Sequence, residues 1–98
     1  MAAFDPVSAA HIFRRASGHL SDTPVNRRLL IDTVDERFLL GSDQFGSEWY
    51  ARVVGTQQVW VLVRNGYIRN GGVNERHRVF NPLTGLSAEE PSHGRTDE

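Results

Sequence analysis

The sequence contains no cysteine and no lysine among its 98 residues. Without cysteine the chain can form neither a disulfide framework nor a cysteine-based zinc site, so cysteine usage does not indicate its compartment. Without lysine no side-chain amine is available for catalysis. All eleven basic side chains are arginine, which binds phosphate through a planar, bidentate fork. The histidines lack the spacing of metal ligands, so we expect no metal and no cofactor.

A long apolar run is also absent. No segment approaches the length of a membrane span, and the first residues lack the apolar core of a signal peptide. We therefore expect a soluble chain without a membrane partner, whose export would depend on something outside this sequence. The length fits one small domain with a modest core.

The net charge of −1 conceals an asymmetry along the chain. Residues 47–84 hold five arginines against two glutamates, whereas residues 87–98 hold four acidic residues against one arginine. A basic half suits a partner that contains phosphate.

Helix signals occupy the first third of the chain, after residues 1–4, which we expect to be loose. Asp5 followed by Pro6 predicts the start of a helix over 7–16, and Gly18 its end. Asp22 or Thr23 can cap a second helix from residue 24 to about 34. The apolar positions expected to be buried are Val7, Ala10, Ile12, Phe13, Val25, Leu29, Leu30 and Val34.

Strand patterns follow over 38–40, 48–54, 57–64 and 78–80. Asn65-Gly66 predicts a tight hairpin, because both central positions of a type I′ turn require a positive φ. We expect a short return strand over 67–69 and a glycine-rich loop over 70–74. The predicted fold class is α+β, with two N-terminal helices packed on an antiparallel sheet of about four strands. A single domain would span residues 1–86, with a disordered acidic tail over 87–98.

A series of short sequence motifs extends over residues 18–86. They are Gly18-His19-Leu20, Asp22-Thr23-Pro24, Leu29-Leu30-Ile31-Asp32, Trp49-Tyr50-Ala51, Gln58-Val59-Trp60-Val61, Val63-Arg64-Asn65-Gly66, Asn70-Gly71-Gly72-Val73-Asn74 and Phe80-Asn81-Pro82 with Thr84-Gly85-Leu86. The series resembles a C-terminal toxin domain of bacterial polymorphic toxins of the contact-dependent inhibition, filamentous haemagglutinin or Rhs type. The helix and sheet order is similar to that of the barnase–EndoU–colicin–RelE ribonuclease group.

The resemblance implies a metal-independent endoribonuclease toxin that acts on RNA, with tRNA favoured, in a competing bacterium. A cognate immunity protein would neutralise it, so the implied states are a toxin monomer or a toxin–immunity heterodimer. The domain would be delivered into the target-cell cytoplasm as part of a larger secreted effector, or be cytoplasmic if free-standing. Its own start at Met1, without a large carrier, departs from the family pattern.

Metal-independent RNA cleavage needs a base, an acid and cations that stabilise the charged phosphorane. His19 is the first acid–base candidate, with Asp22 near enough in sequence to orient it; His77 is the second. Arg64, Arg69 and Asn74 join His19 as candidate catalytic residues. The candidate RNA-binding residues are Tyr50, Arg52, Asn70, Arg78 and Thr84, with Trp60 able to stack bases. We expect one concave, basic face to carry His19, Arg64, Arg69, Asn70 and Asn74.

Each candidate also has an ordinary structural interpretation. His19 can be an exposed loop histidine, the arginines solvated cross-strand charges, the asparagines loop-closing residues, and the tryptophans core. Two other functions stay open: a non-catalytic toxin-like module that binds a protein or RNA, and a DNase. The absence of a metal-ligand cluster in the sequence argues against the DNase.

Overall fold

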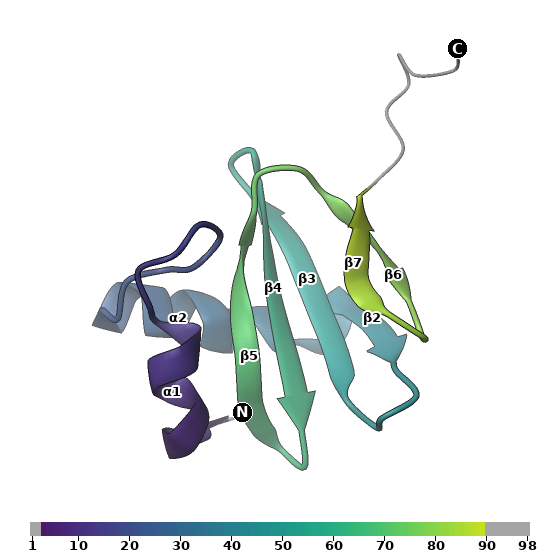
Figure 1. Ribbon diagram of the computed structural model, residues 1–98, viewed down its shortest axis with the longest axis horizontal. Helices are drawn as coiled ribbons and strands as arrows, with labels where there is room; N and C mark the ends of the chain where they lie inside the picture. The colour runs from purple at the N-terminus through teal and green to yellow at the C-terminus, as the bar shows by residue number, and fades with distance from the viewer. Residues whose placement is uncertain (1–2, 90–98) are drawn as a thin grey trace.

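The computed structural model describes residues 3–89 of the chain. The elements in chain order are β1 (Ala3–Phe4), α1 (Pro6–Ile12), α2 (Pro24–Thr33), the 3₁₀ turn η1 (Glu36–Phe38), β2 (Leu39–Ser42), β3 (Glu48–Val54), β4 (Gln57–Arg64), β5 (Tyr67–Asn74), β6 (Arg78–Asn81) and β7 (Gly85–Glu89). Figure 1 shows α2 behind a twisted sheet, α1 beside β5, and the β6–β7 hairpin in front of the sheet. The α+β class with two helices is confirmed.

The helix caps follow the predicted chemistry. The Asp5 carboxylate accepts a hydrogen bond from the Val7 amide at 3.3 Å, and Thr23 Oγ1 accepts one from the Asn26 amide at 3.1 Å. The first helix ends at Ile12, not at residue 16, because the chain turns there to pack the Phe13 ring on Phe4, with centroids 5.5 Å apart.

Three of the expected core positions are exposed. Val7 and Val25 are 87% and 76% exposed, and Ala10 also faces solvent. The reason is that α1 has only seven residues and places Ile12 alone in the core, while α2 meets the sheet through Leu30 and Thr33. The apolar stripe predicted for α2 is therefore narrower than the sequence indicates.

The main sheet has five strands in the order β1-β5-β4-β3-β2. Strands β2 to β5 form the predicted antiparallel meander, and β3 and β4 have the predicted bounds. The sheet as a whole is mixed, because a fifth strand, β1, in the segment expected to be loose, adds in parallel to β5. Phe38 lies in η1 and not in a strand. At the Asn65-Gly66 turn both φ angles are positive, at 54° and 81°.

The predicted glycine-rich loop is a strand. Residues 70–74 belong to β5 and pair with β4 from Gln58 to Leu62. Gly71 and Gly72 are needed here for close packing and not for a turn. A Cβ on Gly71 would press on the Trp60 carbonyl oxygen at 3.1 Å and on Leu30, and a Cβ on Gly72 would overlap the Gly18 carbonyl oxygen.

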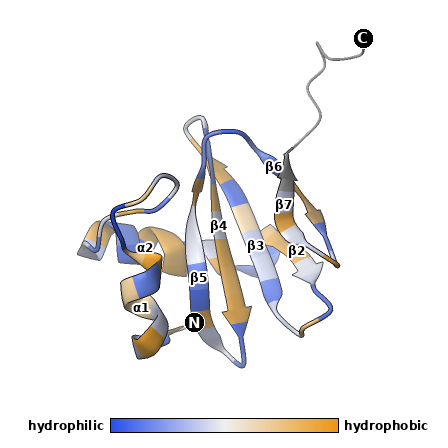
Figure 2. Ribbon diagram, in the orientation of Figure 1, coloured by the Kyte–Doolittle hydropathy of each residue, from blue (hydrophilic) through white to orange (hydrophobic). Residues whose placement is uncertain are grey.

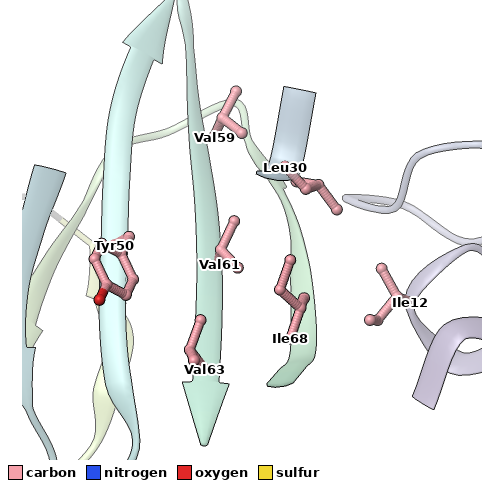
Figure 3. Packing of buried hydrophobic residues seen from close by; sticks show 7 residues of the cluster. All are labelled: Ile12, Leu30, Tyr50, Val59, Val61, Val63 and Ile68. Atoms are coloured by element: carbon pink, nitrogen blue, oxygen red, sulfur yellow. The ribbon is translucent and has the colours of Figure 1, made fainter. Parts of the chain in front are cut away.

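The two faces of the sheet differ in what covers them. Val59, Val61 and Val63 of β4 point toward the helices and pack with the buried cluster that Figure 3 shows, which consists of Ile12, Leu30, Tyr50, Val59, Val61, Val63 and Ile68. Trp60, Leu62 and Arg64 alternate to the opposite side, which we call the outer face. Figure 2 shows β4 hydrophobic over most of its length and the β5–β6 connection hydrophilic.

A second sheet of two strands, β6 and β7, covers part of the outer face. β7 extends the pairing to residue 89, so three residues of the segment expected to be a disordered tail over 87–98 belong to a strand. The burial of Leu86, which is 5% exposed, explains why this strand is held. The rest of the predicted tail, residues 90–98, lies outside the described residues. Within residues 3–89 no helix is long and apolar enough to cross a membrane.

Candidate functional site

A groove crosses the outer face between the α1–α2 loop and the β6–β7 hairpin. It consists of two adjoining cavities of about 440 Å³ and 190 Å³, which share Trp60, Asn74 and Arg78. The remaining lining residues are Ser17, Gly18, His19, Trp49, Val73, Glu75, Arg76, Thr84, Leu86 and Ser87. We call this feature the outer groove. Residues of the α1–α2 loop and of the β6–β7 hairpin line it, and Figure 1 shows this loop and this hairpin on opposite sides of β4.

Aromatic rings form the floor of the outer groove. Trp49 and Trp60 stack with their ring centroids 5.6 Å apart and an interplanar angle of 25°. The Trp49 indole donates a hydrogen bond of 2.8 Å to Asp43 Oδ2. Burial raises the pKa of the Asp43 carboxyl, but the hydrogen bonds from Trp49, Ser47 and Phe45 outweigh it, so the pKa lies below its ordinary value. The charged carboxylate therefore fixes the orientation of the Trp49 ring.

The loop wall is held by one backbone hydrogen bond. Val73 donates its amide to the Gly18 carbonyl oxygen at 3.0 Å, in the part of β5 that extends beyond its pairing with β1 at Tyr67 and Ile68. Gly72 leaves room for this contact because it has no side chain. Gly18 has a φ of 81°, a left-handed conformation that glycine adopts without strain. This docking brings His19 to the margin of the groove.

A buried amide network holds Asn74 and Arg78 side by side. Gln58, which is 9% exposed, accepts hydrogen bonds from Asn74 Nδ2 at 3.0 Å and from the Arg78 amide at 2.9 Å. Its own Nε2 donates to the Arg78 carbonyl oxygen at 3.0 Å. Gln58 lies on the outer face because it is two residues from Trp60 in β4. Its partners Asn74 and Arg78 therefore lie on the same face or at its rim. The network fixes the start of β6 over the groove.

The contacts of His19 define its neutral tautomer. Its Nδ1 lies 3.1 Å from the Ile12 carbonyl oxygen, and since a carbonyl only accepts, Nδ1 carries the proton. In the neutral ring Nε2 is then an acceptor, and it lies 3.4 Å from Arg14 Nη2, which donates to it. A neutral imidazole with one fixed nitrogen and one basic nitrogen has the form that a general base requires.

Arg78, which lines the groove, is held differently from the arginines that pair with carboxylates. Four arginines pair with carboxylates, as Arg27–Asp22, Arg28–Asp32, Arg37–Asp35 and Arg69–Asp5. Arg78 instead donates to the Leu86 carbonyl oxygen at 3.4 Å. Glu75, the carboxylate among the lining residues, accepts a hydrogen bond from Gln57. A guanidinium held by a neutral acceptor keeps its full attraction for an anion.

Some predicted catalytic residues lie apart from this groove. Arg64 is on the outer face but donates to Ser47 Oγ at 2.8 Å, at the other end of β4. Arg69 pairs with Asp5, the cap of α1, at 3.5 Å, without forming a hydrogen bond through its buried Nε. The Asn70 side chain accepts from the Gly71 amide at 2.9 Å. Neither arginine, nor Asn70, lines the outer groove, so the predicted gathering of all five residues is not seen.

Two predicted RNA-binding residues lie on the helix-facing side. Tyr50 belongs to the buried core, and burial together with Glu48 raises the pKa of its hydroxyl. Arg52 donates to Thr33 Oγ1 at 3.0 Å and to the Leu29 carbonyl oxygen at 3.3 Å, so it joins the end of α2 to the sheet. Four of the sequence-predicted residues line the outer groove: His19, Asn74, Arg78 and Thr84. The second candidate histidine, His77, does not line it, and its Nε2 lies 3.2 Å from the Thr56 carbonyl oxygen.

Sequence reasoning missed Gln58 and Arg14. The period-2 alternation of β4 is a sequence signal that places Gln58 on the same side as Trp60. Its hydrogen-bond partners, 16 and 20 residues further along the chain, could not be predicted from the sequence. Within residues 3–89 no group of three or more potential metal ligands occurs. Comparison with models of protein families, with curated proteins and with solved structures finds no match to this chain.

Proposed function

We propose that the outer groove binds single-stranded RNA and cleaves it as a metal-independent endoribonuclease. The observation that carries the proposal is the placement of His19, Arg78 and Asn74 around the Trp60 ring in one cavity. Arginine and asparagine recognise phosphate and base edges, and an indole floor suits an unpaired base. Double-stranded RNA would present no free base to that floor.

The chemistry assigned to His19 is a transesterification. Nε2 takes the proton of a ribose 2′-hydroxyl, the 2′-oxygen forms a bond to phosphorus, and the bond from phosphorus to the 5′-oxygen breaks. Arg78 offsets the charge that develops on the phosphorane. The described lining holds one imidazole, so the leaving 5′-oxygen takes its proton from solvent. The products are a 2′,3′-cyclic phosphate and a 5′-hydroxyl.

The biological setting of the proposal rests on the resemblance of residues 18–86 to polymorphic toxin domains. On that basis the favoured substrate is tRNA of a competing bacterium, and a cognate immunity protein inhibits the toxin. An acidic immunity protein that covers the outer groove would pair with its arginines and exclude RNA. Delivery as part of a larger effector belongs to the same proposal.

The test is incubation of the purified protein with total RNA in EDTA. We expect discrete fragments that end in 2′,3′-cyclic phosphate, with tRNA consumed first. Intact RNA after prolonged incubation with folded protein at micromolar concentration would refute the catalytic proposal.

One observation favours a second candidate, a module that binds RNA without cleaving it. Arg14 already occupies the basic nitrogen of His19, and the described groove lining has no second imidazole to protonate the leaving group. Such a module would retain RNA in a gel-shift assay in EDTA and leave it uncut, with binding reduced by Arg78→Gln.

A further inference from the structure

A second basic surface adjoins the outer groove at the end of α1. It consists of His11, Arg14, Arg15 and His19, and we call it the α1-end cluster. Arg14 bridges the two imidazoles, with Nη1 3.2 Å from His11 Nδ1 and Nη2 3.4 Å from His19 Nε2. The two rings meet edge to face, with centroids 6.3 Å apart. The cluster therefore brings two guanidinium groups and two imidazoles to one exposed position.

A hollow of about 510 Å³ opens beside the cluster. Its lining consists of Phe13, Arg14, Arg15, Ala16, His19, Ser21 and Asp22. Asp22 is already engaged, because Arg27 donates to both of its oxygens at 2.6 Å and 2.9 Å. Neither Arg14 nor Arg15 has a carboxylate partner among residues 3–89. The hollow thus has a net positive wall, and His19 lines both it and the outer groove.

The hydrogen bonds that hold Arg14 are replaceable. At 3.2 Å and 3.4 Å they are longer than charge-assisted bonds from arginine to an anion, which are about 2.7–2.9 Å. A phosphate oxygen is a stronger acceptor than a neutral imidazole nitrogen and can take two guanidinium donors at once. A phosphate in the hollow would therefore draw Arg14 away from both histidines.

We infer that the α1-end cluster is a second phosphate-binding subsite, for a phosphodiester next to the one in the outer groove. Binding there moves Arg14 from His19 Nε2 to the phosphate and so frees the basic nitrogen for the 2′-hydroxyl. The ligand is then an RNA strand that lies across His19, with phosphates on both sides of it. The identity of the ligand as RNA rests on the proposed function, whereas the phosphate site rests on the cluster.

A purely structural role for the same residues is the competing explanation. Cations near the C-terminal end of a helix interact favourably with its dipole, and the cluster lies just there. In that case removing the Arg14 charge would lower the melting temperature and leave phosphate binding unchanged. Binding and stability must therefore be measured on the same variant.

The experiment compares wild type, Arg14→Gln and a control, Arg28→Gln. Arg28 is exposed, pairs with Asp32 on α2, and lines neither the hollow nor the groove. The probes are a 2′-O-methyl oligonucleotide, which cannot be cleaved, and inorganic phosphate. We expect Arg14→Gln to weaken oligonucleotide binding by roughly tenfold and to reduce its salt slope by about 0.7, the loss of one phosphate contact on a single strand. Nitrogen NMR should show the His19 Nε2 resonance shifting when either probe is added to wild type.

The outcomes separate this inference from the proposed function. Equal binding and salt slope for Arg14→Gln and wild type would overturn the subsite, even if the protein cleaves RNA. A shift with inorganic phosphate and loss of oligonucleotide affinity in Arg14→Gln would support it, even if cleavable RNA stays intact. A response to inorganic phosphate without oligonucleotide binding would keep the phosphate site and overturn its assignment to an RNA strand.

Discussion

The position of His19 depends on the absence of a side chain at residue 72, and Gly72→Ala tests this directly. A Cβ at this position would overlap the Gly18 carbonyl oxygen, a backbone atom that cannot rotate away. Gly72 lies within β5 and has no positive φ, so alanine itself fits the backbone. Any loss of stability must therefore come from the collision with the loop.

The magnitude depends on how the loop responds to the collision. If the loop stays in place, overpacking at a site of this kind costs roughly 1–3 kcal/mol. If the loop detaches, the overlap is relieved and the lost hydrogen bond between the Val73 amide and Gly18 costs about 1 kcal/mol. In a domain of this size roughly 1–3 kcal/mol lowers the melting temperature by about 5–20 °C.

The assay is amide hydrogen exchange at Val73 together with thermal unfolding. We expect faster exchange at Val73, a lower melting temperature, and RNA cleavage reduced by roughly tenfold or more because His19 leaves the groove. Gly55→Ala is the matched control: its added Cβ meets nothing, although a φ of 65° makes the substitution strained. It should lower stability without changing exchange at Val73. Unchanged exchange at Val73 in Gly72→Ala would refute the account of how the loop is held.

Three further predictions concern the core, the groove floor and the charge at its rim. Val61→Asp should abolish cooperative unfolding, because it places a carboxylate at a fully buried position of the central strand; a folded variant by circular dichroism would contradict this. The lowered pKa of Asp43 implies stability that is complete above about pH 4 and lost as the pH falls through the folded-state value. Asp43→Asn should reduce the fall in the free energy of unfolding, measured with urea, between about pH 5 and 2. An unchanged fall in the variant would assign this pH dependence to another group. Arg78→Gln should reduce RNA binding and lower its salt slope by about 0.7, whereas a slope equal to that of wild type would exclude a phosphate contact.

Local signals in the sequence predicted the elements whose cause is local. The caps at Asp5 and Thr23, the Asn65-Gly66 turn and the alternation of β3 and β4 each depend on neighbouring residues, and the structure confirms them. The segment over 70–74 was misinterpreted as a loop because its two glycines usually mark flexibility. Their reason lies in contacts with Leu30 and Gly18, about 40 and 50 residues away, which no local pattern reveals.

The candidate site was predictable in part for the same reason. His19, Asn74, Arg78 and Thr84 were identified by residue type and reach one groove. Arg64 and Arg69 are in the hairpin as predicted, but Ser47 and Asp5 engage them. Residue type indicates which side chains can bind a phosphate, whereas tertiary partners decide which of them are already occupied.

Cleavage by a matched pair of histidine variants tests the central claim most directly. His19→Ala removes the imidazole that lines the outer groove, and His77→Ala removes one that lies outside its lining. The measurement is the rate at which 2′,3′-cyclic phosphate ends form on tRNA in EDTA, with both variants shown to be folded. The account predicts a fall of roughly 10²-fold or more for His19→Ala, the scale of losing one acid–base group, and no change for His77→Ala. Full activity in His19→Ala, or loss confined to His77→Ala, would contradict it.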